Sequence, residues 1–226
     1  MGIELQQTQL GKVFVELRHK EAFSLPDVRF KILDKTITNF PNYNMDAPDK
    51  LSVINPNKGQ FGHFFLNRSV FDWDEPQSLQ AFFKESLQLF DTVLPILKID
   101  VLHRVGFRVQ WKMKFNDKET VSKYIMNNYF KENFLQHDLA DDIYEPGIRF
   151  SGRKGTIRFN FQLTTLHEQI MEAAINGPVK QQENHFLLID LDVYRDNNQN
   201  PRNLNNFFRD ANDFINNQFS NYLSNL

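Results

Sequence analysis

The chain has 226 residues, enough for one large domain or two small ones, and 41% of them are hydrophobic. It contains no cysteine, which excludes disulfides, thiolate zinc sites and cysteine nucleophiles. The formal net charge is −2, so the chain as a whole lacks the basic excess that usually accompanies nucleic-acid binding. Phe is abundant, at 23 residues, and predicts a core built from large aromatic side chains.

The start of the chain has neither a basic region nor an apolar run, and no stretch approaches 18 apolar residues. A signal peptide needs a basic region followed by an apolar run, and a membrane-spanning helix needs about 18 or more apolar residues. We therefore expect a cytoplasmic protein that does not bind a membrane. The absence of cysteine fits a reducing compartment.

Segments with alternating or β-rich composition predict strands in the first part of the chain. These segments are 13–18, 28–33, 51–54 and 61–71. Residues 40–50 contain two prolines and two asparagines and predict a loop. Residues 55–59 have the chemistry of a turn, so the last two strands are expected to form a hairpin.

An apolar stripe with spacings of three and four residues predicts a helix that ends at Pro95. Asp72, Asp74 and Glu75 place negative charge at its expected start, and Pro76 suits its first turn. The stripe consists of Leu79, Phe82, Phe83, Ser86, Leu87, Phe90, Val93 and Leu94.

Residues 102–115 give the clearest two-residue period in the chain. The apolar side chains at 105, 107, 109, 111 and 113 face one way, and most of the polar ones face the other way. One buried face and one hydrated face are typical of an antiparallel sheet.

The rest of the chain predicts strands and helices separated by polar loops. The expected order is a helix at 118–135, an acidic loop at 136–146, strands at 147–150 and 156–163, a strand at 185–194, a polar loop at 196–201 and a helix at 203–223. Residues 164–184 are ambiguous. They either extend the preceding strand into a long hairpin that turns at Asn176 and Gly177 or form a short helix, and we favour the hairpin.

Two stretches of the chain resemble each other. Each has a His-Phe-x-Leu strand, at His63 and His185, followed by an apolar helix, at Leu79 and Leu204. One explanation is an internal duplication; the other is a chance match between amphipathic helices in a Phe-rich chain. A duplication would join two halves, 10–97 and 100–225, in one curved sheet with pseudo-twofold symmetry.

The order of elements in the second half, strand, helix, three strands and helix, resembles one half of the TATA-binding-protein-like fold. Residues 13–18, and residues 187–194 followed by the closing helix, resemble a sporadically distributed bacterial family of uncharacterised proteins of about 250 residues. That resemblance implies no activity or site residues. The patchy distribution of the family implies genes that travel between genomes, as mobile-element and defence genes do.

These patterns together predict an α+β fold over residues 1–226. We expect a single domain with a mainly antiparallel curved sheet and long amphipathic helices on one face. The function, where it is readable, is then expected on the opposite face.

Asp190 and Asp192 lie two residues apart on a predicted strand, so their carboxylates point to the same face. Such a pair can hold Mg²⁺ together with phosphate ligands. The alternative is a pair of solvated charges on the face away from the helices. No other catalytic set stands out, because the chain lacks a Gly-x-Ser-x-Gly turn, a phosphate loop and a histidine pair with zinc spacing. We therefore expect no cofactor.

Basic residues form the strongest hint of a binding surface. One strand carries Arg104, Arg108, Lys112 and Lys114 on its polar side, and the hairpin that follows carries Arg149, Arg153, Lys154 and Arg158. If they are neighbours, they make the outer face of the sheet positive. The alternative is that Glu16, Asp190 and Asp192 neutralise them across the sheet.

The sequence predicts a non-enzymatic binding protein. Its ligand would be a partner protein, a nucleic acid or a small anion, held on the open sheet face or in a cleft between the halves. The alternative is a metal-dependent enzyme that acts on phosphates through Asp190 and Asp192. A homodimer is compatible with either function.

Overall fold

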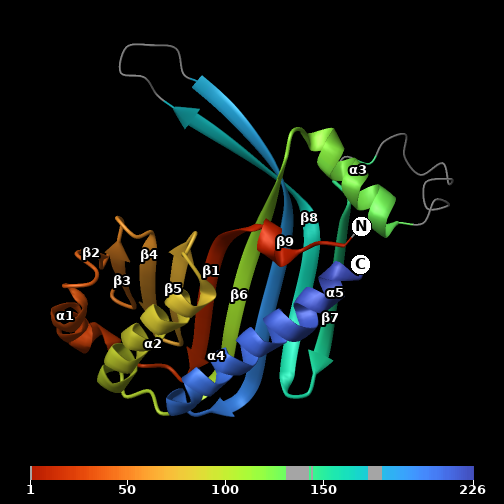
Figure 1. The fold of residues 1–226 in the computed structure, drawn as a ribbon. Coiled ribbons are helices and arrows are strands. Elements are labelled where there is room, and N and C mark those ends of the chain that lie inside the picture. The colour runs from red at the N-terminus through yellow and green to blue at the C-terminus, as the bar shows by residue number, and fades with distance from the viewer. Residues whose placement is uncertain (1, 131–142, 144, 173–179) are drawn as a thin grey trace.

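The computed structural model describes residues 2–130, 143, 145–172 and 180–226. They form an α+β fold around one antiparallel sheet of nine strands in the order β2-β3-β4-β5-β1-β6-β9-β8-β7 (Figure 1). The strands are β1 (Gln9–His19), β2 (Asn42–Asn44), β3 (Lys50–Asn55), β4 (Gln60–Phe65), β5 (Arg68–Asp74), β6 (Leu102–Phe115), β7 (Gly147–Lys154), β8 (Ile157–Glu172) and β9 (Lys180–Gln199). The predicted antiparallel sheet is therefore confirmed.

The helices lie on one face of this sheet, as Figure 1 shows for α2 and α4. They are α1 (Leu25–Thr36), α2 (Leu79–Ile96), α3 (Lys118–Tyr129), α4 (Leu204–Asp213) and α5 (Ser220–Ser224). The π-helical segment η4 (Phe214–Phe219) joins α4 to α5. Among the described residues, no helix lies over the other face, and we call that face the open face.

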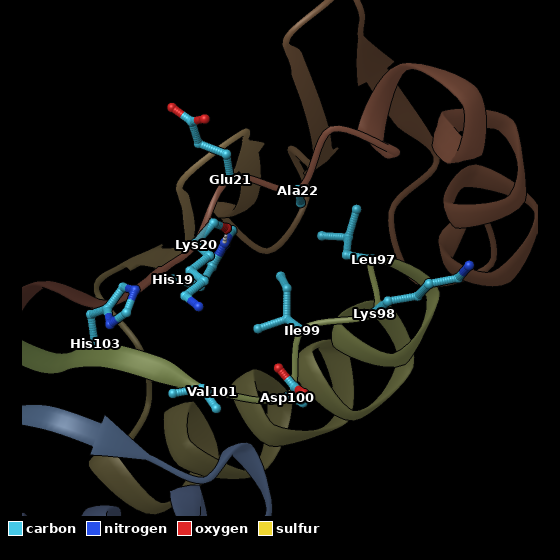
Figure 2. A pocket seen from close by; sticks show the side chains of 10 residues that line it. All are labelled: His19, Lys20, Glu21, Ala22, Leu97, Lys98, Ile99, Asp100, Val101 and His103. Atoms are coloured by element: carbon cyan, nitrogen blue, oxygen red, sulfur yellow. Dashed lines mark hydrogen bonds between the residues drawn. The ribbon is translucent and has the colours of Figure 1, made fainter.

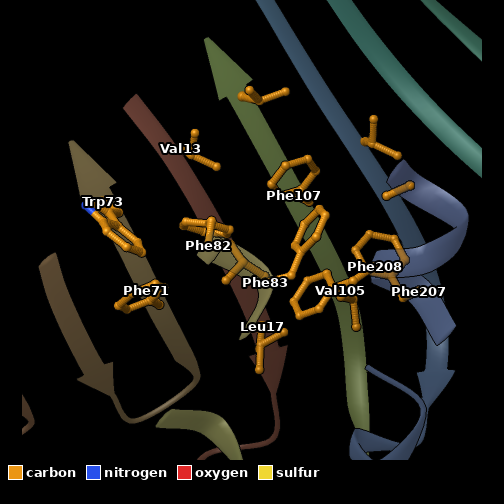
Figure 3. Packing of buried hydrophobic residues seen from close by; sticks show 14 of the residues in the cluster. Val13, Leu17, Phe71, Trp73, Phe82, Phe83, Val105, Phe107, Phe207 and Phe208 are labelled. Atoms are coloured by element: carbon orange, nitrogen blue, oxygen red, sulfur yellow. The ribbon is translucent and has the colours of Figure 1, made fainter. Parts of the chain in front are cut away.

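Phenylalanine rings fill the space between the helices and the sheet (Figure 3). Phe71 and Phe107 project from the sheet, whereas Phe82, Phe83 and Phe208 project from α2 and α4, and all five are buried. Burying one such side chain contributes about 1.5–3 kcal/mol. The Phe-rich composition therefore supplies the core, as expected.

The segment 28–33 was predicted as a strand, and this prediction is wrong. It lies in α1, which begins with Pro26 in its first turn and buries Leu25, Ile32 and Leu33 at helical spacing. Phe30 is 70% exposed. The alternation at the start of the segment therefore does not separate a buried face from a hydrated one.

The predicted strand 61–71 is in fact two strands, β4 and β5, which pair with each other. Asp72 and Asp74 belong to β5 and do not start a helix. Helix α2 begins after Ser78, whose side-chain oxygen accepts a hydrogen bond from the Ala81 backbone N–H at 3.1 Å. Pro95 lies in the last turn of α2, one residue before its end.

The second half follows the prediction more closely. The favoured hairpin over 164–184 is confirmed by the pairing of β8 with β9 from Arg158 to Glu172, although its predicted turn at 176–177 lies outside the described residues. The polar loop predicted at 196–201 is wrong up to Gln199, because β9 extends to that residue. The end of the predicted helix 118–135 and most of the acidic loop 136–146 also lie outside the described residues.

Apart from the short edge strand β2, which has no counterpart among the described residues of the second half, the two halves have the same connectivity. Strand β1, helix α1, strands β3–β5 and helix α2 are followed by β6, α3, β7–β9 and α4, and the two sets meet where β1 pairs with β6. Phe83 of α2 stacks on Phe208 of α4, with ring centroids 4.8 Å apart. In this arrangement helix α2 corresponds to helix α4, as in the sequence comparison. The two histidines do not correspond, because His63 lies on β4, which takes the place of β8, whereas His185 lies on β9. Common ancestry of the halves stays a prediction.

Candidate functional site

The open face displays the alternate residues of each strand that point away from the buried core. Basic side chains outnumber acidic ones there, although the whole chain is slightly acidic. The basic residues are Lys12, Arg18, Lys50, Arg68, Arg104, Arg108, Lys112, Lys114, Arg149, Arg153 and Arg158. The acidic residues are Glu16, Asp72, Asp74, Glu168, Asp190, Asp192 and Asp196.

Four of the predicted binding cations are paired with acids on neighbouring strands. Arg108 holds Asp190 through two nitrogens, with its Nε 2.7 Å from Oδ1. The other pairs are Arg104 with Asp192 at 3.1 Å, Lys112 with Glu168 at 2.5 Å and Arg158 with Asp196 at 3.0 Å. The alternative of cross-strand neutralisation is therefore confirmed for Arg104 and Arg108.

Arg149, Arg153 and Lys154 form no ion pair with any residue in the described part of the chain. Arg153 donates a hydrogen bond to the Gly155 carbonyl at 3.1 Å. Arg149 lies beside Arg108 at a hollow of about 130 Å³, which Asp190 and Asp192 also line. The predicted basic patch is thus split into a neutralised centre and a less compensated end at β7.

The carboxylates of Asp190 and Asp192, predicted as a metal site, are occupied by protein donors. Asp190 also accepts a hydrogen bond from Gln110 at 3.0 Å, and Asp192 accepts one from Asn160 at 3.0 Å. Burial raises the pKa of Asp192. Within the described ranges no group of three or more His, Asp or Glu side chains is placed to hold a metal ion. A cation at this pair would have to displace the arginines, so the geometry does not favour the metal site.

A row of three rings on β4 is the feature that sequence reasoning missed. Phe61, His63 and Phe65 alternate with buried Phe64 and therefore lie together on the open face. Their ring centroids are 6.3 Å and 6.5 Å apart in turn. The period-two pattern of rings was a visible signal, but reading 61–71 as one strand hid it. We call these three residues the aromatic row.

Lysine and arginine side chains lie over the rings of the aromatic row. Lys12 is 5.9 Å from the centroid of Phe61, and Lys50 and Arg68 are 5.7 Å and 4.5 Å from that of Phe65. Three further cation–π pairs extend this pattern across the face. They are Arg108 with Phe14 at 5.6 Å, Arg104 with Tyr194 at 4.0 Å and Lys112 with Phe186 at 5.6 Å. Each pair keeps a cation and a flat apolar surface side by side.

His63 lies in the middle of the aromatic row and is held by two neighbours. Its Nδ1 is 2.8 Å from the Ser52 hydroxyl, and its Nε2 is 3.5 Å from Asp72. Burial lowers the pKa of His63, so its ring is neutral at pH 7. His185 does not meet His63 but lies beside His167, with 3.0 Å between their Nδ1 atoms.

A cavity of about 510 Å³ opens where the connection from β1 to α1 meets the connection from α2 to β6 (Figure 2). It lies at the boundary between the halves, where a cleft was expected. None of Asp190, Asp192 and His185 lines it. The lining residues are His19, Lys20, Glu21, Ala22, Leu97, Lys98, Ile99, Asp100, Val101 and His103.

Both ring nitrogens of His19 are already engaged by the protein. Its Nδ1 is 2.8 Å from the Lys20 carbonyl, which can only accept a hydrogen bond, so the proton is on Nδ1. Its Nε2 therefore accepts a hydrogen bond from Ser69, at 3.2 Å. Ser69 is fully buried and does not line the cavity, so the pair formed by His19 and Ser69 is not displayed to a ligand there.

His19 is expected to make the protein less stable in mild acid. Burial lowers its pKa below the ordinary 6.5, so the unfolded chain binds more protons than the folded one as pH falls through that value. The contribution of neutral His19 to the free energy of unfolding is therefore complete at about pH 7.5 and decreases as the pH is lowered towards about pH 5. His19→Gln should flatten this fall in the free energy of unfolding, measured by urea denaturation across that range. Identical profiles for His19→Gln and the parent would contradict the assignment.

The chain is an α+β protein with one antiparallel sheet. Among the described residues, helices cover only one face of that sheet. No family model matches the chain, and no curated protein matches it either. None of the described helices is long and apolar enough to cross a membrane. The two resemblances named above, the cytoplasmic location and the homodimer all stay predictions.

Proposed function

We propose that this chain is a non-enzymatic protein that binds single-stranded nucleic acid on the open face. The observation that carries the proposal is the aromatic row on an uncovered strand, with Lys12, Lys50 and Arg68 lying over its rings. Proteins that bind single strands combine aromatic side chains, on which bases stack, with cations that follow the phosphates.

The chemistry of the row suits stacking better than binding of a small anion. Asp72 lies beside both Lys12 and His63, at 2.8 Å and 3.5 Å, and would repel an anion bound at that point. A neutral base is not repelled, and the π-face of every base can stack on Phe61 or Phe65. Lys50 and Arg68, further along the row, are then placed to reach the phosphates.

The rings are also accessible without being fully exposed. Phe61 and Phe65 are partly buried, because the neighbouring strands support their edges. A supported ring loses little conformational freedom when a base stacks on it. The row is therefore largely preorganised for an extended strand of nucleic acid.

Replacing Phe65 by alanine tests the stacking role. A stacked base contributes about 1–3 kcal/mol, so the affinity for fluorescein-labelled dT20 or rU20 should fall about tenfold or more. The measurement is fluorescence anisotropy at 50 mM salt. Phe30→Ala, which removes an exposed ring from α1 on the other side of the molecule, is the matched control and should leave the affinity unchanged.

The salt dependence separates this proposal from its competitors. Each phosphate contact adds about 0.7 to the slope of log K against log salt for a single strand, so Lys50→Gln combined with Arg68→Gln should reduce the slope. Affinity that is insensitive to salt, or equal in Phe65→Ala and the parent, would overturn the proposal. So would the absence of any binding to dT20 and rU20 at 100 µM protein, on the order of the weakest non-specific binding of nucleic acid.

A further inference from the structure

A second site lies on the helix side of the sheet at its β7 edge, where Arg153, which belongs by its register to the open face, also lines the site. It is a cavity of about 300 Å³ between the edge hairpin of β7 and β8 and the C-terminal helical segment. The volume is at the lower limit for small-molecule sites. No residue of the aromatic row, and none of the four ion pairs described above, lines it.

The cavity has an aromatic wall. Phe150 makes edge-to-face contacts with Phe159 and Tyr222, at centroid distances of 6.2 Å and 5.8 Å. Phe214 packs on Phe159 at 5.2 Å. Phe219 completes the wall. Aromatic rings prefer edge-to-face and offset contacts with further rings, so this wall favours a ligand that carries a ring.

The π-helical segment η4 contributes to the wall. In an α-helix, two residues five positions apart point about 140° away from each other, but Phe214 and Phe219 both point to the sheet and are buried. Gln218 lies between them, is exposed and lines the cavity. Its side-chain amide has no hydrogen-bond partner among the described residues. π-helical turns occur frequently at functional sites.

The charge at the cavity has one sign. Arg153 and Lys154 line it, no acidic residue does, and neither cation has an ion-pair partner in the described part of the chain. An aromatic wall beside two uncompensated cations is complementary to a molecule with a ring at one end and an anion at the other.

We propose that this cavity binds a small aromatic carboxylate. The ring of the ligand would pack against Phe159, Phe214 and Tyr222. Its carboxylate would meet Arg153 and Lys154, and the Gln218 amide would donate a hydrogen bond to it. The site is independent of the proposed function, because the aromatic row lies on β4, towards the other end of the sheet from β7.

The probe for the test is 4-phenylbutyrate, titrated into the full chain by isothermal calorimetry. Arg153→Gln combined with Lys154→Gln should weaken its binding at least tenfold. Both side chains lie at an exposed turn, so the variant should fold. The charge-matched control, Lys35→Gln combined with Lys84→Gln, removes two exposed cations from α1 and α2 and should bind as the parent does. Gln218→Trp, which fills the mouth of the cavity, should abolish binding.

Two analogues of the probe, one without the anion and one without the ring, test the two parts of the proposed recognition separately. The parent should bind 4-phenylbutanol, which lacks the anion, and octanoate, which lacks the ring, each at least tenfold more weakly than 4-phenylbutyrate. Equal binding of the alcohol would overturn the role of the cations, and equal binding of octanoate would overturn that of the rings. The site itself would be overturned if 4-phenylbutyrate did not bind the parent at 2 mM, which is on the order of the weakest affinity worth assigning to a site. It would also be overturned if Gln218→Trp bound the probe as well as the parent does.

Discussion

Phe208→Ala is expected to lower the free energy of unfolding by about 3–5 kcal/mol, the cost of emptying a well-packed Phe site. Phe208 is 1% exposed. Its ring lies on that of Phe83, with an interplanar angle of 17°, where α2 and α4 meet over the centre of the sheet (Figure 3). The surrounding side chains come from both halves and cannot all move in to fill the space.

Urea denaturation followed by circular dichroism measures this loss. Phe23→Ala is the matched control, because Phe23 is 72% exposed and its removal should change stability by less than about 0.5 kcal/mol. In a double-mutant cycle with Phe83→Ala, the two losses should not add, and the coupling should be about 0.5–1.5 kcal/mol. A loss below about 1 kcal/mol for Phe208→Ala would contradict the packing described for the two helices.

The long elements were predictable because their periodicity is set by a single buried face. Helix α2, strand β6 and the C-terminal helical region each bury one stripe over many residues, so the period is repeated several times. Helix α1 failed for the opposite reason. No residue between Leu25 and Ile32 is buried, so its apolar stripe is interrupted, and its first positions alternate by coincidence.

The candidate site was only partly predictable. The two-residue period of β6 places Arg104, Arg108 and Lys112 on one face, and the sequence predicted this shared face. Their partners lie 56 to 88 residues away along the chain. The register of β6 against β9, and that of β9 against β8, decide which acid meets which cation. The sequence could name Asp190 and Asp192 as candidates, but only the pairing shows that they are held by arginines.

The aromatic row shows how a missed turn hides a surface. The hairpin between β4 and β5 turns at Leu66 and Asn67, which carry no Gly or Pro to mark it. Once the turn is placed, Phe61 and Phe65 fall on the open face and Phe71 falls in the core. A shift of one residue in a strand exchanges its two faces, so the position of a turn decides whether a ring belongs to the core or to a binding surface.

Arg108→Ala is expected to destabilise the fold by about 2–4 kcal/mol, because it leaves a buried carboxylate without its main partner. The side chain of Asp190 is 7% exposed, whereas that of Arg108 is 40% exposed. The two hydrogen bonds between them raise the pKa of Arg108, as expected for a guanidinium stabilised by an anion. Removing the cation leaves Gln110 as the remaining side-chain donor to Asp190 among the described residues.

The cost should come from the stranded charge and not from the loss of the pair as such. Replacing both partners, with Arg108→Leu and Asp190→Leu, should therefore restore much of the stability that Arg108→Ala loses, because well-packed apolar residues can replace a buried ion pair at little cost. Arg18→Ala serves as the exposed control. Its side chain is 53% exposed and its ion pair with Glu16 should contribute at most about 1 kcal/mol. The measurement is urea denaturation at pH 7 of the parent, Arg108→Ala, the double leucine variant and Arg18→Ala. A double variant that is less stable than Arg108→Ala would show that the ion pair itself holds β6 against β9.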